Sequence, residues 1–85
     1  MLTIKVLGPG CDNCKKVEQA ARQAVAMLSV ETQIEKVTDR ALFAQYGLLA
    51  TPGLVINEKL VSAGRIPSAA EVTTWIANAL EQEPA

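Results

Sequence analysis

The chain opens with a short aliphatic run at residues 2–7, which ends at Gly8-Pro9-Gly10 and passes within a few residues into a helical pattern. An aliphatic run that is ended by glycine and proline is typical of a β-strand entering a tight loop. From Cys14 onward, apolar residues recur at the three- and four-residue intervals of one helix face: Val17, Ala20, Ala21, Ala24, Val25 and Leu28. The chain therefore begins with a strand, a loop and a helix.

Two further elements are predicted in the middle of the chain. The segment Val30–Val37 favours a second strand, because it is rich in β-branched residues. Thr38 or Asp39 can cap a short helix that follows, and Gly47 can end it in the left-handed conformation common at helix ends. The residues of that helix expected to face inward are Leu42, Phe43 and Tyr46.

The rest of the chain predicts a hairpin and a last helix. Residues 54–56 and 60–61 are aliphatic runs separated by a turn that starts at Asn57. Ser68 stands three residues before Glu71, which is the spacing of a capping box at a helix start. Apolar positions then follow at helical spacing: Val72, Trp75, Ile76, Ala79 and Leu80.

The predicted order is strand, helix, strand, helix, two strands and a helix (βαβαββα). A strand–helix–strand passage forms a right-handed parallel crossover, and a hairpin adds antiparallel strands. We therefore expect an α/β fold with a mixed four-stranded sheet and helices on both of its faces. A chain of 85 residues falls in the size range of one domain, so we expect residues 1–85 to form a single domain.

Composition argues against two classes of partner. The formal net charge is -1 and aromatic residues make up 4%, whereas nucleic-acid readers show a basic stripe with stacking aromatics. No stretch approaches the roughly 18 to 20 apolar residues of a membrane span, and the start of the chain is strand-like instead of resembling a leader peptide. We expect a cytoplasmic monomer that binds neither nucleic acid nor a membrane.

The only two cysteines form a Cys11-Asp12-Asn13-Cys14 motif at the start of the first helix. Such a motif in a chain without secretory features indicates redox or metal chemistry. Cys14 lies three residues before Val17, so its sulfur is expected to face the sheet, while Cys11 at the helix entrance faces water. Cys11 could then attack a partner's disulfide and Cys14 could resolve the mixed disulfide, without a cofactor.

The start of a helix also influences the acidity of a thiol. Unpaired backbone N–H groups and the positive end of the helix dipole stabilise a thiolate there. Lys15 and Lys16 either add to this effect or simply form a solvated helix face. Asp12 places a negative charge beside Cys11 and opposes it. We therefore expect Cys11 to be less acidic than in strongly oxidising proteins, so that the protein acts as a reductant.

A proline marks the start of the third strand, in Thr51-Pro52. Proline cannot donate a hydrogen bond to a sheet, so it belongs at a strand start or an edge. The residue pair is compatible with a cis peptide bond and equally with an ordinary strand-start proline.

Together, Gly8-Pro9-Gly10-Cys11-Asp12-Asn13-Cys14 after a first strand and Thr51-Pro52 before a hairpin resemble the thioredoxin superfamily. The likeness is to its small redox-active disulfide proteins of the archaeal thioredoxin and glutaredoxin-like type. The resemblance implies strand order 2-1-3-4, a cis-proline beside the cysteines, Cys11 as nucleophile and Cys14 as resolving thiol. It also implies that Thr51 offers backbone hydrogen bonds to an extended substrate, and that the partners are protein disulfide clients and a reductase.

The sequence departs from larger relatives of that superfamily at several positions. Thioredoxins proper carry Trp before the first cysteine and Gly-Pro between the two, where this chain has Gly10 and Asp12-Asn13. They also keep a buried acid six residues before the first cysteine, and here that position is Lys5. The acidic glutathione clamp of glutaredoxins is not reproduced by Gly64-Arg65.

Three alternatives remain open from the residues. Copper chaperones of the heavy-metal-associated type also place C-x-x-C between a strand and a helix, and two thiolates suit Cu(I). Their order of elements differs, because their helix is followed by a strand pair. A structural zinc ion wants four ligands, so two chains would have to share it, and we expect no metal. A non-catalytic interaction module with this fold is the third alternative.

Overall fold

The computed structural model describes residues 2–10 and 12–82. The elements follow the predicted order, and their bounds are β1 Leu2–Leu7, α1 Asp12–Leu28, β2 Thr32–Val37, α2 Arg40–Gln45, β3 Gly53–Ile56, β4 Lys59–Ala63 and α3 Ala69–Gln82. Within the described residues, no helix combines the length and apolar character needed to cross a bilayer.

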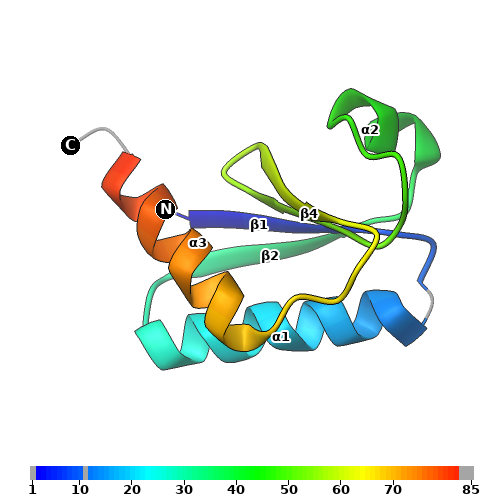
Figure 1. The fold of residues 1–85 in the computed structure, drawn as a ribbon. Coiled ribbons are helices and arrows are strands. Elements are labelled where there is room, and N and C mark those ends of the chain that lie inside the picture. The colour runs from blue at the N-terminus through cyan, green and yellow to red at the C-terminus, as the bar shows by residue number, and fades with distance from the viewer. Residues whose placement is uncertain (1, 11, 83–85) are drawn as a thin grey trace.

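The four strands form one mixed sheet in the order β2-β1-β3-β4 (Figure 1). Strands β1 and β2 pair in parallel, whereas β3 is antiparallel to both β1 and β4. The predicted sheet and its strand order are therefore confirmed. Strand β1 is an interior strand and ends at the loop before α1. That loop therefore emerges near the middle of one end of the sheet, where the strands finish.

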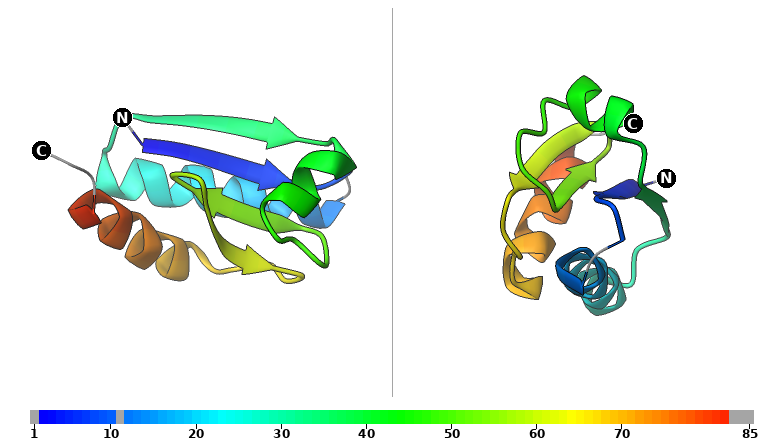
Figure 2. Two further views of the ribbon diagram at one scale, coloured as in Figure 1. Left: turned by 90° about the horizontal axis from the view of Figure 1, so that it is seen from above. Right: turned by 90° about the vertical axis from the view of Figure 1, so that its right-hand side faces the viewer.

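Helices α1 and α3 cover one face of the sheet, and α2 covers the other (Figures 1 and 2). The larger core lies between the sheet and the two long helices. Alternate residues of β1 and β3 meet one stripe of each helix there: Leu2, Ile4, Val6, Leu54 and Ile56 from the strands, Val17, Ala21 and Ala24 from α1, and Val72 and Ile76 from α3. Helices on both faces were predicted, and this is confirmed.

A smaller core lies under α2 on the opposite face. Its buried residues are Leu7, Val37, Phe43, Leu48 and Val55. The predicted inward residue Phe43 is buried, while Leu42 and Tyr46 are half-buried at its edge. A helix of one and a half turns cannot cover this face alone, so Leu48 from the following loop completes the layer.

Local signals fix both ends of α2. The Asp39 carboxylate accepts a hydrogen bond of 2.9 Å from the Ala41 amide. Of the two predicted caps, Thr38 and Asp39, the second therefore caps the helix. Gly47 adopts φ +77° and ends the helix as predicted. The reversal lets the Leu48 amide donate to the Phe43 carbonyl at 3.0 Å, which turns Leu48 back toward the sheet.

The β3–β4 hairpin is tighter and more irregular than its sequence indicates. Asn57 and Glu58 both have positive φ and make a two-residue turn, so Lys59 already belongs to β4. Asn57 is also tied to β1: its amide donates to the Thr3 carbonyl and its side-chain oxygen accepts from the Thr3 amide. The pairing with β3 skips Val61, which forms a bulge that the sequence did not predict.

Candidate active site

Cys14 lies in the first turn of α1 and faces the sheet. Its side chain is 5% exposed, as its spacing from Val17 predicted. The sulfur packs directly against Gly8, and a Cβ atom added at Gly8 would overlap with Sγ of Cys14. Glycine at this position is therefore what allows the thiol to approach the end of β1. Cys11, the predicted nucleophile, lies outside the described residues.

The sheet register brings this thiol to the same end of the molecule as Thr51 and Pro52. Leu7 at the end of β1 pairs with Gly53 at the start of β3. In an antiparallel ladder the next residues outward, Gly8 and Pro52, then lie across from each other. The Thr51–Pro52 peptide bond is cis. Two segments that are far apart in sequence thus converge at the end of β1 and the start of β3.

The loop that carries Pro52 is held from two sides. The Gly64 amide, just after β4, donates a hydrogen bond of 2.9 Å to the Pro52 carbonyl. At Gly53 a Cβ atom would lie 2.6 Å from Cδ1 of Leu48, so Leu48 packs tightly on the start of β3. Pro52 is buried, whereas Thr51 is exposed. Among the described residues, no hydrogen bond occupies the backbone of Thr51.

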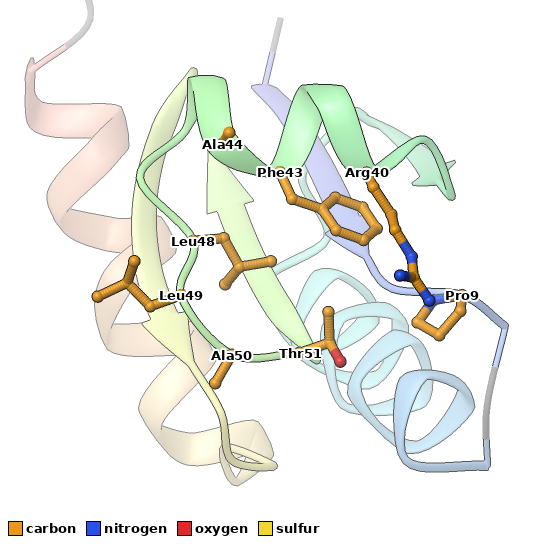
Figure 3. Close-up of a pocket in the computed structure, with 8 residues that line it drawn as sticks. All are labelled: Pro9, Arg40, Phe43, Ala44, Leu48, Leu49, Ala50 and Thr51. Carbon is orange, nitrogen blue, oxygen red and sulfur yellow. The ribbon is translucent and has the colours of Figure 1, made fainter.

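A cavity of about 440 Å³ opens beside Thr51, between α2, the loop before β3 and the loop after β1. Figure 3 shows its lining, which is mostly apolar: Pro9, Arg40, Phe43, Ala44, Leu48, Leu49, Ala50 and Thr51. We call this cavity the α2 groove. Its walls come from three segments, and Leu49 on its rim is 99% exposed.

Lys5 is tied into a polar network on the α2 face. Its ammonium donates to the Tyr46 hydroxyl at 2.7 Å and forms an ion pair with Glu58 at 2.8 Å. The Tyr46 hydroxyl donates in turn to the second oxygen of Glu58 at 2.6 Å. The Lys5 side chain is 19% exposed, so the charge is largely covered and is balanced by a carboxylate from the β3–β4 turn.

This network holds both of its charged groups in the ionised form. The hydrogen bonds that Lys5 donates to Glu58 and Tyr46 raise the pKa of its ammonium group. The hydrogen bond from Lys5, followed by that from Tyr46, lowers the pKa of Glu58. Lys5 therefore remains a paired cation at neutral pH and does not serve as a proton acceptor for a thiol.

A second charged cluster stabilises the passage from β4 into α3. Ser68 and Glu71 form the predicted capping box, with the Glu71 amide donating to Oγ of Ser68 and the Ser68 amide donating to Glu71. Arg65 adds a two-pronged contact to the Glu71 carboxylate at 3.2 and 2.7 Å and lies over the Trp75 ring. The hydrogen bonds from Arg65, then Ser68, lower the pKa of Glu71 to about 2.

The charged residues next to the cysteine motif are all solvent-exposed. Asp12 is the first residue of α1, and Lys15 and Lys16 follow Cys14 on the outer side of the helix. They form no ion pair with one another or with other described residues.

Sequence reasoning did not identify the α2 groove, the Lys5 network or the contact between Gly8 and Cys14. The groove needs Pro9, Arg40 and Leu49 to meet in space, and nothing local in the sequence connects them. The adjacent pair Leu48-Leu49 was the one available signal, since two adjacent leucines after a helix-ending glycine cannot both face the same core.

Comparisons with known proteins agree with this architecture. A family model described as a thioredoxin domain matches residues 2–77. A thioredoxin from Methanothermobacter thermautotrophicus is 36% identical over 72 residues, which cover 85% of this chain and 94% of that protein. A thioredoxin from Methanocaldococcus jannaschii is 32% identical over 81 residues, covering 95% of this chain and 93% of that protein.

Solved structures also share the fold at low sequence identity. The J-Trx1 fragment of ERdj5 matches with a TM-score of 0.67 and 19% identity, covering 95% of this chain and 44% of that one. The germline-specific thioredoxin Deadhead from Drosophila melanogaster matches with a TM-score of 0.63 and 16% identity, covering 91% and 79%. These likenesses confirm the predicted thioredoxin-like fold.

Proposed function

This chain belongs to the thioredoxin family, and from that premise we propose that it is a thiol–disulfide oxidoreductase that reduces protein disulfides through Cys11 and Cys14. One observation carries the proposal: the thiol of Cys14 is buried against Gly8, at the sheet end where Pro52 lies. A sheltered thiol next to a substrate-binding loop suits a resolving cysteine, because it reacts only after a partner has been captured at Cys11.

The reaction exchanges one disulfide for another. The Cys11 thiolate attacks one sulfur of a client disulfide, a new S–S bond forms, and the client's other sulfur leaves as a thiolate. The Cys14 thiolate then attacks Sγ of Cys11, which forms the Cys11–Cys14 disulfide and releases the client as a dithiol. Two electrons and two protons from a separate reductase restore the dithiol and complete the cycle. No cofactor is needed in these steps.

Thr51 and Pro52 are proposed to bind the client. The exposed backbone of Thr51 is an available donor and acceptor for an extended segment, which would pair with it as a strand pairs with a sheet edge. Pro52 offers no N–H group of its own, and its carbonyl is already used by Gly64. Pro52 therefore shapes the site, and Thr51 makes the contacts.

We place this chemistry in the cytoplasm, in cell redox homeostasis and electron transport, with protein disulfides as clients and a reductase as the electron donor. Asp12 beside Cys11 supports a reducing couple, because a carboxylate raises the cost of forming a nearby thiolate.

The test is reduction of insulin disulfides with a dithiol as electron source, measured for the natural protein and for the Cys11→Ser and Cys14→Ser variants. We expect Cys11→Ser to abolish turnover and Cys14→Ser to accumulate a mixed disulfide, with the circular dichroism of both variants unchanged. Turnover that persists in folded Cys11→Ser protein would refute the role of Cys11, and a folded natural protein without turnover would favour a non-catalytic module.

A reduction-potential measurement against a thiol buffer, together with metal analysis, distinguishes the oxidoreductase from a metal carrier that uses the same two cysteines. About 30 mV corresponds to a tenfold change in the two-electron equilibrium, so a coarse value is enough to classify the couple. We expect a value in the reducing range near that of thioredoxins and no copper or zinc at stoichiometric amounts. In copper chaperones the first helix is followed by a pair of strands, whereas in this chain α2 separates β2 from β3. This order of elements supports the redox assignment.

A further inference from the structure

We propose that the α2 groove selects client segments that carry a carboxylate side chain close to the reacting cysteine, and that Arg40 is the residue that binds this carboxylate. The inference rests on the proposed function and adds a substrate class to it. The groove is continuous with the exposed Thr51, so a segment that contacts Thr51 lies against the groove wall.

The lining of the groove combines apolar surface with a single charge. Of its eight residues, Arg40 alone is charged, and the others are aliphatic or aromatic apart from Thr51. Leu49 on the rim is 99% exposed, so an apolar side chain of a partner would remove it from water. The complementary segment therefore contains an apolar residue and an acidic one.

Arg40 is available for such a contact. Among the described residues, the ion pairs engage four other basic side chains, namely Lys5, Arg22, Lys36 and Arg65, while Arg40 has no carboxylate partner. Its neighbour Asp39 uses a carboxylate oxygen to cap α2 at the Ala41 amide. Figure 3 shows the Arg40 side chain reaching from α2 toward Pro9, which lies in the loop after β1.

The chemistry of arginine favours a carboxylate over other acceptors. Its planar guanidinium presents paired N–H donors that match the two oxygens of Asp or Glu, and such contacts are stronger than neutral hydrogen bonds. Arg40 is exposed and lines the same cavity as Phe43, so its guanidinium can meet a carboxylate of a bound segment. A client that carries a lysine in place of this carboxylate would be repelled by the positive charge of Arg40.

The test uses short synthetic peptides that carry one cysteine as a mixed disulfide with 2-mercaptoethanol. Three versions differ in one residue, Glu, Gln or Lys, placed in turn at each position flanking the cysteine. We measure the second-order rate of reduction at low salt. At the position that meets Arg40, the Glu peptide is expected to react about fivefold faster than the Lys peptide, and added salt should reduce the ratio.

Two variants, each of which replaces one positive charge by one negative charge, test whether the effect depends on Arg40. Arg40→Glu is expected to reverse the preference, so that the Lys peptide reacts faster than the Glu peptide. Lys59→Glu is the matched control, because Lys59 is exposed at the turn end of β4, away from the groove, and it should keep the natural ratio. Because each result is a ratio within one protein, a uniform loss of rate in a variant cancels.

Two further measurements keep this inference distinct from the proposed function. Reduction of the uncharged hydroxyethyl disulfide reports on the redox activity alone. Binding of cysteine-free Glu and Lys peptides to the Cys11→Ser protein, followed by NMR shifts at the Arg40 side chain and the Thr51 amide, reports on charge selection without chemistry. The inference is overturned if the Glu and Lys peptides react and bind alike, or if Lys59→Glu changes the ratio as much as Arg40→Glu does.

Discussion

The two faces of the sheet are built for different tasks. Under α1 and α3, ten buried residues from strands and long helices form a continuous apolar core, and its fully buried side chains include Leu54 and Ile76. Under α2, a helix of six residues covers five buried side chains, and the remaining surface holds the Lys5 network and the α2 groove. The larger apolar core therefore lies on one side of the sheet, and the groove lies on the other.

Cys14 belongs to the first of these faces and Thr51 opens onto the second. The thiol is positioned by a long helix and packs against Gly8, just after β1, whereas the groove is bounded by a short helix and loops. We expect substitutions under α1 and α3 to change the free energy of unfolding most, and substitutions around the groove to change client rates.

The largest effect is expected from the same substitution made on each face. Leu54, in β3, is 0% exposed in the larger core, and Leu48 is 8% exposed under α2. Replacing a buried leucine by alanine typically costs about 2–5 kcal/mol, and more where the surroundings cannot collapse. We expect about 4 kcal/mol for Leu54→Ala and about 2 kcal/mol for Leu48→Ala, measured by urea unfolding. Equal costs would show that the two cores contribute alike.

Gly8→Ala should destabilise the protein by about 1–3 kcal/mol, because the added methyl group overlaps with the Cys14 sulfur and overpacking has costs of this size. The measurement is again the free energy of unfolding, together with the rate of disulfide reduction, which should fall. In a Cys14→Ala background the cost of Gly8→Ala should shrink, because the atom that it meets is gone. A cost that is the same in both backgrounds would place the strain elsewhere.

A smaller effect is expected from Glu71→Gln on the α3 side. The folded pKa of Glu71 is lowered to about 2 from its usual value of 4.5, so its stabilising contribution is complete above pH 4.5 and is lost as the pH falls toward 2. The variant should be less stable than the natural protein at neutral pH, and the difference should vanish over that window. The free energy of unfolding measured as a function of pH checks this. Glu35→Gln is the control, because Glu35 is an exposed residue of β2.

The smallest change in stability is expected from Leu49→Ser, since a side chain that is 99% exposed contributes almost nothing to folding. The free energy of unfolding should stay within about 0.5 kcal/mol of the natural value. Reduction of protein disulfides should slow, while reduction of a small disulfide that does not reach the rim should keep its rate. A loss of stability comparable to that of Leu48→Ala would contradict the division between the two faces.

The sequence alone determined the order of elements along the chain. Spacing of three and four residues located α1 and α3, Ser68 and Glu71 marked the start of α3, and Gly47 marked the end of α2. These signals are local, because periodicity, caps and left-handed glycines act within one or two turns. The same reasoning placed Cys14 on the buried side of its helix.

Tertiary structure decided everything that depends on residues distant in the chain. The juxtaposition of Gly8 and Pro52 follows from strand register, and the ion pair of Lys5 depends on a glutamate 53 residues away. The bulge at Val61 and the α2 groove likewise result from how strands and loops meet. Local sequence patterns do not predict such pairings, because the contacts that stabilise them exist only after the strands have assembled into the sheet.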